Sequence, residues 1–242
     1  MRIELMYRAT VALFIALSSS AAHAESKLEV YTVNYPLAYF AQRIGADSVN
    51  VHFPAPRDAD PAFWNPEIST IVEYQNADLI FLNGAGYARW VTRTSLPRRK
   101  LVDTSRTFHD KLLHIEDLAT HVHGPSGTHS HTGTAFVTWL DPVQAIEQAR
   151  AIERAFARAR PSQSKAYETR FERLATDLKT LDAELRMALK PFTGRPMVAS
   201  HPVYQYLARR YELDLRSVTW EPGEIPDGEA WRGFKTLLES CA

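Results

Sequence analysis

Cysteine is almost absent from this chain of 242 residues, in which Cys241 is the only one. One cysteine cannot form an intramolecular disulfide, which excludes the small disulfide-stabilised scaffolds of exported proteins. A catalytic thiolate needs a partner that lowers its pKa, and we expect Cys241 to be incidental. Stability must therefore come from a packed core, and the chain is long enough for one large domain or two lobes.

Net charge is absent as well, because 28 lysine and arginine residues balance 28 aspartate and glutamate residues. Such a balance gives no electrostatic reason to expect nucleic acid or an anionic lipid surface as a partner. The apolar run from Ala9 to Leu17 is only about half the roughly 20 residues that a membrane-spanning helix needs. We therefore expect a small or proteinaceous partner, no nucleic acid, and no stable membrane insertion of the mature chain.

The first residues have the pattern of an export signal. Arg2 and Arg8 give a positive start, an apolar run follows, and Ala22-His23-Ala24 has the small-x-small form of a cleavage site. These features predict a signal peptide over residues 1–24 and export to the periplasm, with an uncleaved membrane anchor as the alternative. Because no cysteine lies near the cleavage site, a lipid anchor has no attachment point, and we expect a soluble monomer.

Strand-like and helix-like segments alternate over residues 25–160. β-branched and aromatic runs predict short strands, and apolar residues three or four apart predict the helices between them. Asp141-Pro142 supplies an N-cap and a first helical position, and Pro161 ends that helix. This alternation is typical of an α/β lobe with a mostly parallel sheet. The predicted strands are 28–33, 49–53, 78–83 and 101–102, and the helices start at 35, 68 and 142.

A long helix is predicted next, because apolar residues recur three or four apart over 162–190 without an intervening glycine or proline. About 28 residues at 1.5 Å each give roughly 40 Å, which is longer than one small lobe is wide. We therefore expect residues 161–191 to link two lobes. The apolar stripe consists of Tyr167, Phe171, Leu174, Leu178, Leu181 and Leu185.

A second α/β lobe is expected over residues 192–242. Its predicted strands are 196–200 and 213–220, with a helix at 202–211 and a last helix from Glu229. Because the chain stops after a helix, where a parallel sheet would continue with another strand, we expect this lobe to be incomplete at its C-terminus. The predicted fold class is α/β, with two lobes of mostly parallel sheet joined by a long helix.

A histidine-rich segment, residues 119–133, interrupts the first lobe and has little apolar periodicity, which predicts a loop. It contains two His-x-His pairs, and each pair can supply two imidazole nitrogens to one metal ion. A solvated connection whose histidines serve only as a metal reservoir is the alternative. The paired histidines are His121, His123, His129 and His131.

Five short motifs follow one another along the chain: Val33-Asn34-Tyr35-Pro36-Leu37, Asp60-Pro61, Asn76-Ala77-Asp78-Leu79-Ile80 with Asn83-Gly84, Trp139-Leu140-Asp141-Pro142, and Ser200-His201 before Tyr204-Gln205-Tyr206-Leu207. In this order they resemble the metal-binding substrate-binding proteins of bacterial ABC importers for zinc and manganese. The resemblance implies two α/β lobes joined by a long rigid helix, with the metal held between them by three histidines and one carboxylate.

The resemblance places the three family histidines at positions where this chain has Ala62, Val137 and His201. Only His201 matches, and the family carboxylate would lie beyond the last residue. Glu221, at the end of a predicted strand, is the candidate oxygen ligand. We expect the His-x-His pairs to reach the region where Val137 has replaced a ligand. The candidate metal ligands are therefore His201, His129, His131, His121, His123 and Glu221.

These residues favour a periplasmic protein that captures zinc, or manganese or another divalent transition metal, and delivers it to the membrane permease of an ABC importer. A periplasmic zinc buffer or metallochaperone is an alternative. A zinc hydrolase is a third reading, but the chain has no His-Glu-x-x-His helix and no nucleophile motif around His201. We therefore do not expect an enzyme.

Overall fold

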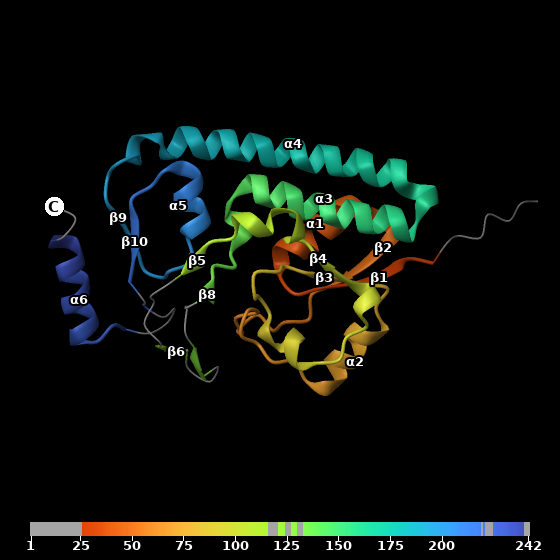
Figure 1. Ribbon diagram of the computed structural model, residues 1–242, viewed down its shortest axis with the longest axis horizontal. Coiled ribbons are helices and arrows are strands. Elements are labelled where there is room, and N and C mark those ends of the chain that lie inside the picture. The colour runs from red at the N-terminus through yellow and green to blue at the C-terminus, as the bar shows by residue number, and fades with distance from the viewer. Residues whose placement is uncertain are drawn as a thin grey trace, which may run out of the picture.

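The computed structural model describes residues 26–115, 121–123, 127–129, 133–218, 220 and 225–239, and at 115, 121–123 and 127–129 it describes the backbone alone. Within these ranges no helix combines the length and the apolar character needed to cross a membrane. The predicted signal peptide lies outside them. A four-stranded sheet and a two-stranded sheet lie toward opposite ends of one long helix, as Figure 1 shows.

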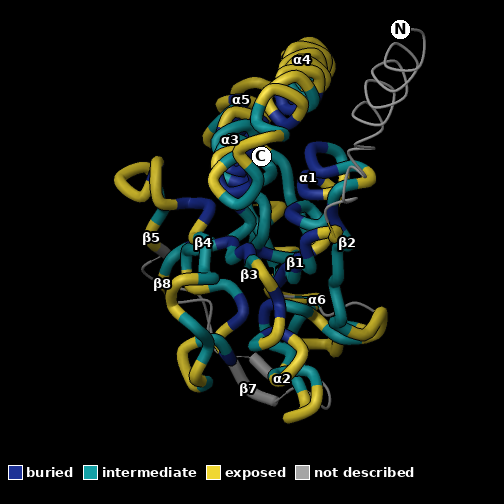
Figure 2. The backbone as a smooth tube through the Cα atoms, turned by 90° about the vertical axis from the view of Figure 1, so that its right-hand side faces the viewer, coloured by how far each residue is buried: buried dark blue, intermediate teal, exposed yellow. Residues whose placement is uncertain are grey.

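The first lobe is built on four parallel strands in the order β2-β1-β3-β4. Helices α1 (Tyr35–Gly45) and α3 (Pro142–Ala159) cover one face, and α2 (Ile68–Asn76) lies on the other (Figures 1 and 2). The predicted α/β alternation is confirmed. Because the strand order reverses between β1 and β3, their carboxyl ends form a switch point of the kind where open α/β sheets bind ligands. The strands are β1 (Leu28–Thr32), β2 (Val49–His52), β3 (Leu79–Leu82) and β4 (Leu101–Asp103).

Side-chain caps fix where the main helices of this lobe begin. Asn34 Oδ1 accepts a hydrogen bond from the backbone N–H of Leu37 at 3.0 Å, and Asp141 Oδ1 accepts one from Val143 at 3.0 Å. Each helix has a proline in its first turn, where a missing N–H costs nothing. The apolar faces behind these caps form the core, in which Leu37, Phe40, Ile44, Ile152 and Phe156 are buried.

Helix α4 (Ser164–Leu189) runs along both lobes (Figure 1), which confirms the predicted long helix. Its N-terminal half belongs to the first-lobe core, where Tyr167 and Phe171 are buried. The C-terminal half leaves that core, and there Leu181 is 44% exposed. Asp182 bonds instead to Arg210 of the second lobe, with Oδ1 accepting from Nε at 2.9 Å.

The second lobe contains two parallel strands, β9 (Met197–Ala199) and β10 (Leu215–Ser217), with helices α5 (Gln205–Tyr211) and α6 (Gly228–Glu239). Strand β10 is shorter than the predicted span of 213–220. Backbone pairing nevertheless continues beyond it, because Trp220 N–H donates to the carbonyl of Ser200 at 2.8 Å. The carboxyl ends of both strands therefore lie together.

The histidine-rich segment differs from its prediction as a loop. Strands β5 (His114–Ile115) and β8 (Gly133–Thr134) pair antiparallel, as do β6 (His121–His123) and β7 (Gly127–His129). Residues 114–134 are called the histidine hairpin from here on. Periodicity missed these strands because backbone hydrogen bonds alone can pair a short polar ladder, without an alternating apolar face.

Candidate metal site

Four buried polar side chains meet at the carboxyl ends of the first-lobe strands. The Asn83 side-chain oxygen, just after β3, accepts hydrogen bonds from Asn34 Nδ2 and Gln148 Nε2, each at 3.1 Å. Asn83 Nδ2 donates to the carbonyl of Phe136 at 2.9 Å, and Gln148 Nε2 also donates to Thr104 Oγ1 at 3.1 Å. Buried polar groups with these partners favour a single arrangement. The network therefore fixes the segment around Phe136 to the switch point between β1 and β3.

Two positions where the resemblance implies histidine lie beside this network, and both carry apolar residues. Ala62, in the segment after β2, is 2% exposed, and its N–H donates to Asp60 Oδ1 at 2.8 Å. Val137 follows Phe136 directly. The neighbouring rings of Phe63 and Phe136 pack edge to face, with centroids 6.0 Å apart. This edge of the first lobe thus presents apolar and aromatic side chains at both positions instead of imidazoles.

Tyr87 extends this aromatic surface. Its ring packs against Phe136 at 5.4 Å and against Trp139 at 5.8 Å between centroids. Burial, and after it the negative charge of Asp60, raises the pKa of the Tyr87 phenol far above its usual range. The phenol is therefore protonated at neutral pH.

His201 lies at the carboxyl end of the second-lobe sheet, two residues after β9. The side chain is half-buried, and its Nδ1 lies 3.4 Å from the carbonyl oxygen of Trp220. A proton on Nδ1 directed at a carbonyl fixes the tautomer in which Nε2 carries the metal-binding lone pair. The position and the backbone partner of His201 are thus typical of a histidine that binds a metal.

The other predicted ligands are only partly described. His121 and His123 belong to β6 and His129 to β7, and the backbone register sets His121 opposite His129. The side chains of these histidines, and the whole of His131 and Glu221, lie outside the described part of the chain. Trp220, which precedes Glu221, pairs with Ser200 and has its carbonyl beside His201. Of the segment around Glu221, the structure thus describes only Trp220, which lies beside His201.

No three side chains of histidine, cysteine, aspartate or glutamate converge among those that the structure describes. His201 is the one predicted ligand whose side chain is in view. Convergence of the hairpin histidines on His201 therefore stays a prediction.

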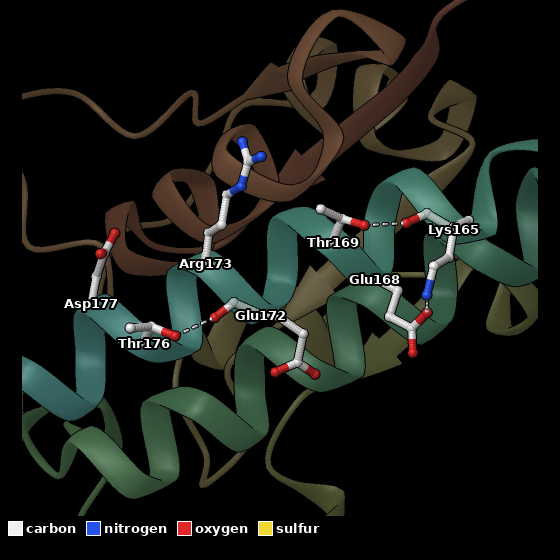
Figure 3. A pocket seen from close by; sticks show the side chains of 7 residues that line it. All are labelled: Lys165, Glu168, Thr169, Glu172, Arg173, Thr176 and Asp177. Atoms are coloured by element: carbon white, nitrogen blue, oxygen red, sulfur yellow. Dashed lines mark hydrogen bonds and ion pairs between the residues drawn. The ribbon is translucent and has the colours of Figure 1, made fainter.

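A shallow depression of about 650 Å³ on the surface of α4 is a different feature (Figure 3). Two of its carboxylates are engaged in ion pairs: Glu168 lies 2.9 Å from Lys165, and Glu172 lies 2.8 Å from Arg150. All described lining residues come from one face of this single helix. The depression is a solvated helix face whose carboxylates are already paired with cations, which makes it a poor metal site. The lining residues are Lys165, Glu168, Thr169, Glu172, Arg173, Thr176 and Asp177.

Comparison with models of known protein families shows the family to which this chain belongs. The family model described as zinc-uptake complex component A, periplasmic (ZnuA), matches residues 30–234. The chain belongs to this family. The match extends over both lobes and the long helix, and it confirms the resemblance carried by the sequence motifs.

Named members are similar over most of this chain. Zinc-binding lipoprotein AdcA of Streptococcus pneumoniae is 27% identical over 94% of this chain and 45% of its own length. The high-affinity zinc uptake system protein ZnuA of Bacillus subtilis is 28% identical over 92% of this chain and 72% of its own. A crystal structure of ZnuA superimposes with a TM-score of 0.73 at 22% identity, covering 89% of this chain and 79% of that one. The chain thus spans less than half of AdcA, and the structural match supports the fold.

Proposed function

We propose that this protein captures zinc, or a related divalent transition metal, and delivers it to the membrane permease of an ABC importer. The family match over residues 30–234 supports this function, as do the names of the relatives. The observation that carries it is His201, held at the carboxyl end of a parallel sheet with its Nδ1 beside a backbone carbonyl. The metal is cargo, and the protein is a binding protein without an enzymatic reaction of its own.

The proposed site combines His201 with nitrogens from the histidine hairpin and an oxygen from Glu221. Zinc in proteins is usually held by four nitrogen, sulfur or oxygen ligands, and one histidine does not suffice. Ala62 and Val137 supply no ligand, which leaves the hairpin as the source of the missing nitrogens. The register that sets His121 opposite His129 supports a joint contribution from β6 and β7. His123 and His131 are the further candidates.

The proposed organisation follows the sequence analysis: a signal peptide over 1–24, a first lobe over 25–160, a linking helix over 161–191 and a second lobe from 192. The signal pattern supports action in the periplasm, and the protein acts as a monomer. Copurification with a permease and its ATPase tests delivery, since a zinc buffer would bind the metal without that partner.

Calorimetric zinc titrations of three variants test the site. His201→Ala should weaken binding by at least the 10- to 100-fold that loss of a ligand's supporting partner causes. Replacing all four paired histidines of the hairpin by asparagine should be about as damaging, and the combined variant should be no worse than either, because both changes dismantle one site. Tight one-to-one binding that survives the combined change would refute the proposed ligands. Binding weaker than about 10 µM in the unaltered protein, equivalent to only about 7 kcal/mol, would refute metal capture itself.

A further inference from the structure

Tyr206, on α5, joins the second lobe to the base of the histidine hairpin. Its side chain is fully buried, and its hydroxyl donates to the carbonyl of Ala135 at 2.8 Å. The same hydroxyl accepts a hydrogen bond from the backbone N–H of Leu113 at 3.1 Å. A phenol has only one proton to donate, and Tyr206 donates it to Ala135. The same hydroxyl oxygen accepts the hydrogen bond from Leu113, so it bonds to the chain at both ends of the hairpin.

The two backbone groups that Tyr206 binds belong to the residues that flank the histidine hairpin on either side. Leu113 directly precedes β5, Ala135 directly follows β8, and Ala135 N–H donates to the carbonyl of Leu113 at 2.8 Å. Every His-x-His pair of the chain lies between these two residues. One hydroxyl from the second lobe therefore bonds to both ends of the segment that contains all the paired histidines.

Helix α5 is itself fixed within the lobe that carries His201. It begins four residues after that histidine, and Gln205 Nε2 in its first turn donates to the carbonyl of Pro202, the residue after His201, at 2.8 Å. Arg209 adds a second tie to the hairpin base, because its guanidinium donates to the carbonyl of Lys111 at 2.7 Å. Figure 1 shows β5 and β8 beside α5. The hairpin base thus has a defined position relative to the second-lobe sheet.

We propose that Tyr206 is a positioning residue, which holds the base of the histidine hairpin against the lobe of His201 so that both bind the same metal ion. This inference rests on the proposed function, since it assumes that the hairpin and His201 share a site. A hairpin base that is ordered before the metal binds has less conformational entropy left to lose on binding. Tyr206 would therefore raise metal affinity without touching the metal.

The two hydrogen bonds from Tyr206 to the hairpin base, called the clamp from here on, can be tested in the absence of metal by amide hydrogen exchange of Tyr206→Phe. The substitution keeps the buried ring and removes the hydroxyl. Tyr211→Phe is the matched control, because it removes a hydroxyl from the same helix whose partner, Asp182, lies on α4 at 3.0 Å. We expect faster exchange at Leu113 and Ala135 in Tyr206→Phe and unchanged exchange at both amides in Tyr211→Phe. Equal protection of these amides in all three proteins would overturn the clamp, whatever the metal data show.

Zinc titration then tests positioning. Tyr206→Phe should weaken binding about tenfold, which corresponds to about 1.4 kcal/mol. Tyr211→Phe should leave affinity unchanged. In the variant whose four hairpin histidines are asparagine, Tyr206→Phe should have no further effect.

The outcomes separate this inference from the proposed function. If the hairpin histidines matter and Tyr206→Phe leaves affinity unchanged, Tyr206 is not a positioning residue, while the proposed site stands. If Tyr206→Phe weakens zinc binding equally with and without the hairpin histidines, its effect does not act through the hairpin, and the inference is again overturned. If replacing the hairpin histidines changes nothing, the shared site fails and the inference fails with it.

Discussion

Gly84 shows how a single residue supports the polar network below the candidate site. Its φ is +74°, and a Cβ added there would lie 1.9 Å from Ser105 Oγ and 2.4 Å from Asp103 Oδ1. The Asp103 oxygen already accepts from the backbone N–H and the hydroxyl of Ser105, at 2.9 and 2.8 Å. Those groups cannot move away without losing these hydrogen bonds. The close approach thus requires glycine next to Asn83.

We predict that Gly84→Ala destabilises the fold by about 2–3 kcal/mol, because it adds a clash to the cost of a positive φ. Gly86→Ala is the matched control, since its φ is +76° and nothing lies within 4 Å of an added Cβ. It should cost only about 1 kcal/mol. Chemical denaturation of both variants measures the difference. Equal losses of unfolding free energy would mean that the contact with Ser105 has no energetic weight.

Imidazole ligation also predicts a pH dependence. A histidine must lose its proton to bind a metal, and an unperturbed histidine has a pKa near 6.5. Zinc affinity should therefore be full above about pH 7 and fall as the pH drops through about 6. Zinc should raise the melting temperature less at pH 5 than at pH 7. Equal shifts at both pH values would indicate carboxylate rather than imidazole ligands.

At the scale of elements, α4 and α5 are joined through Asp182. Hydrogen bonds from Arg210 are the largest influence on the pKa of the Asp182 carboxyl and lower it. Burial raises this pKa and the hydrogen bond from Tyr211 lowers it, and the net result is a pKa below the usual value near 3.8. A carboxyl with a lowered folded-state pKa contributes stability above its unfolded-state pKa and loses it as the pH falls through the folded-state value. The contact between α4 and the second lobe should therefore weaken in acid.

We predict that Asp182→Asn lowers the free energy of unfolding by about 1–2 kcal/mol at pH 7, as expected for hydrogen bonds to a charged group that is partly exposed. The difference from the unaltered protein should shrink as the pH falls below about 4. Glu184→Gln, on the same helix and exposed, is the control and should have little effect. A loss that persists undiminished at pH 3 would show that packing rather than charge holds the two elements together.

The elements that the sequence predicted are those with local signals. The cap and proline at Asp141-Pro142 mark α3, and the apolar stripe beginning at Tyr167 marks α4. Contacts between distant positions left no such signal. Asn83 and Gln148 are 65 residues apart, and Leu113 and Tyr206 are 93 apart, so neither contact follows from periodicity.

The candidate site was predictable only as a set of residue types. The family resemblance made His201 a candidate ligand, and imidazole chemistry made the paired histidines candidates. Whether the pairs converge on His201 depends on the three-dimensional path of the hairpin. Short polar strands have no hydrophobic periodicity from which that path could be predicted. The structure adds the hairpin base and its attachment to α5, neither of which the histidine spacing could predict.

At the scale of the whole molecule, the two sheets contribute unequally to the proposed site. The second lobe supplies His201 at its carboxyl edge, whereas the first lobe presents Ala62 and Val137 among aromatic rings. The hairpin extends from the first lobe, and its base is bonded to the second through Tyr206. In this account the hairpin takes over the part that the first-lobe histidines have in the family pattern.

X-ray absorption at the zinc edge of the stoichiometric zinc complex tests this account most directly. The account predicts about four light ligands at about 2.0–2.1 Å, with the scattering pattern of at least two imidazoles. Replacing the hairpin histidines by asparagine should reduce the imidazole contribution, and His201→Ala should remove one imidazole from the remainder. A shell of oxygens without imidazole scattering, or one that is the same in all three proteins, would contradict a zinc site shared by His201 and the histidine hairpin.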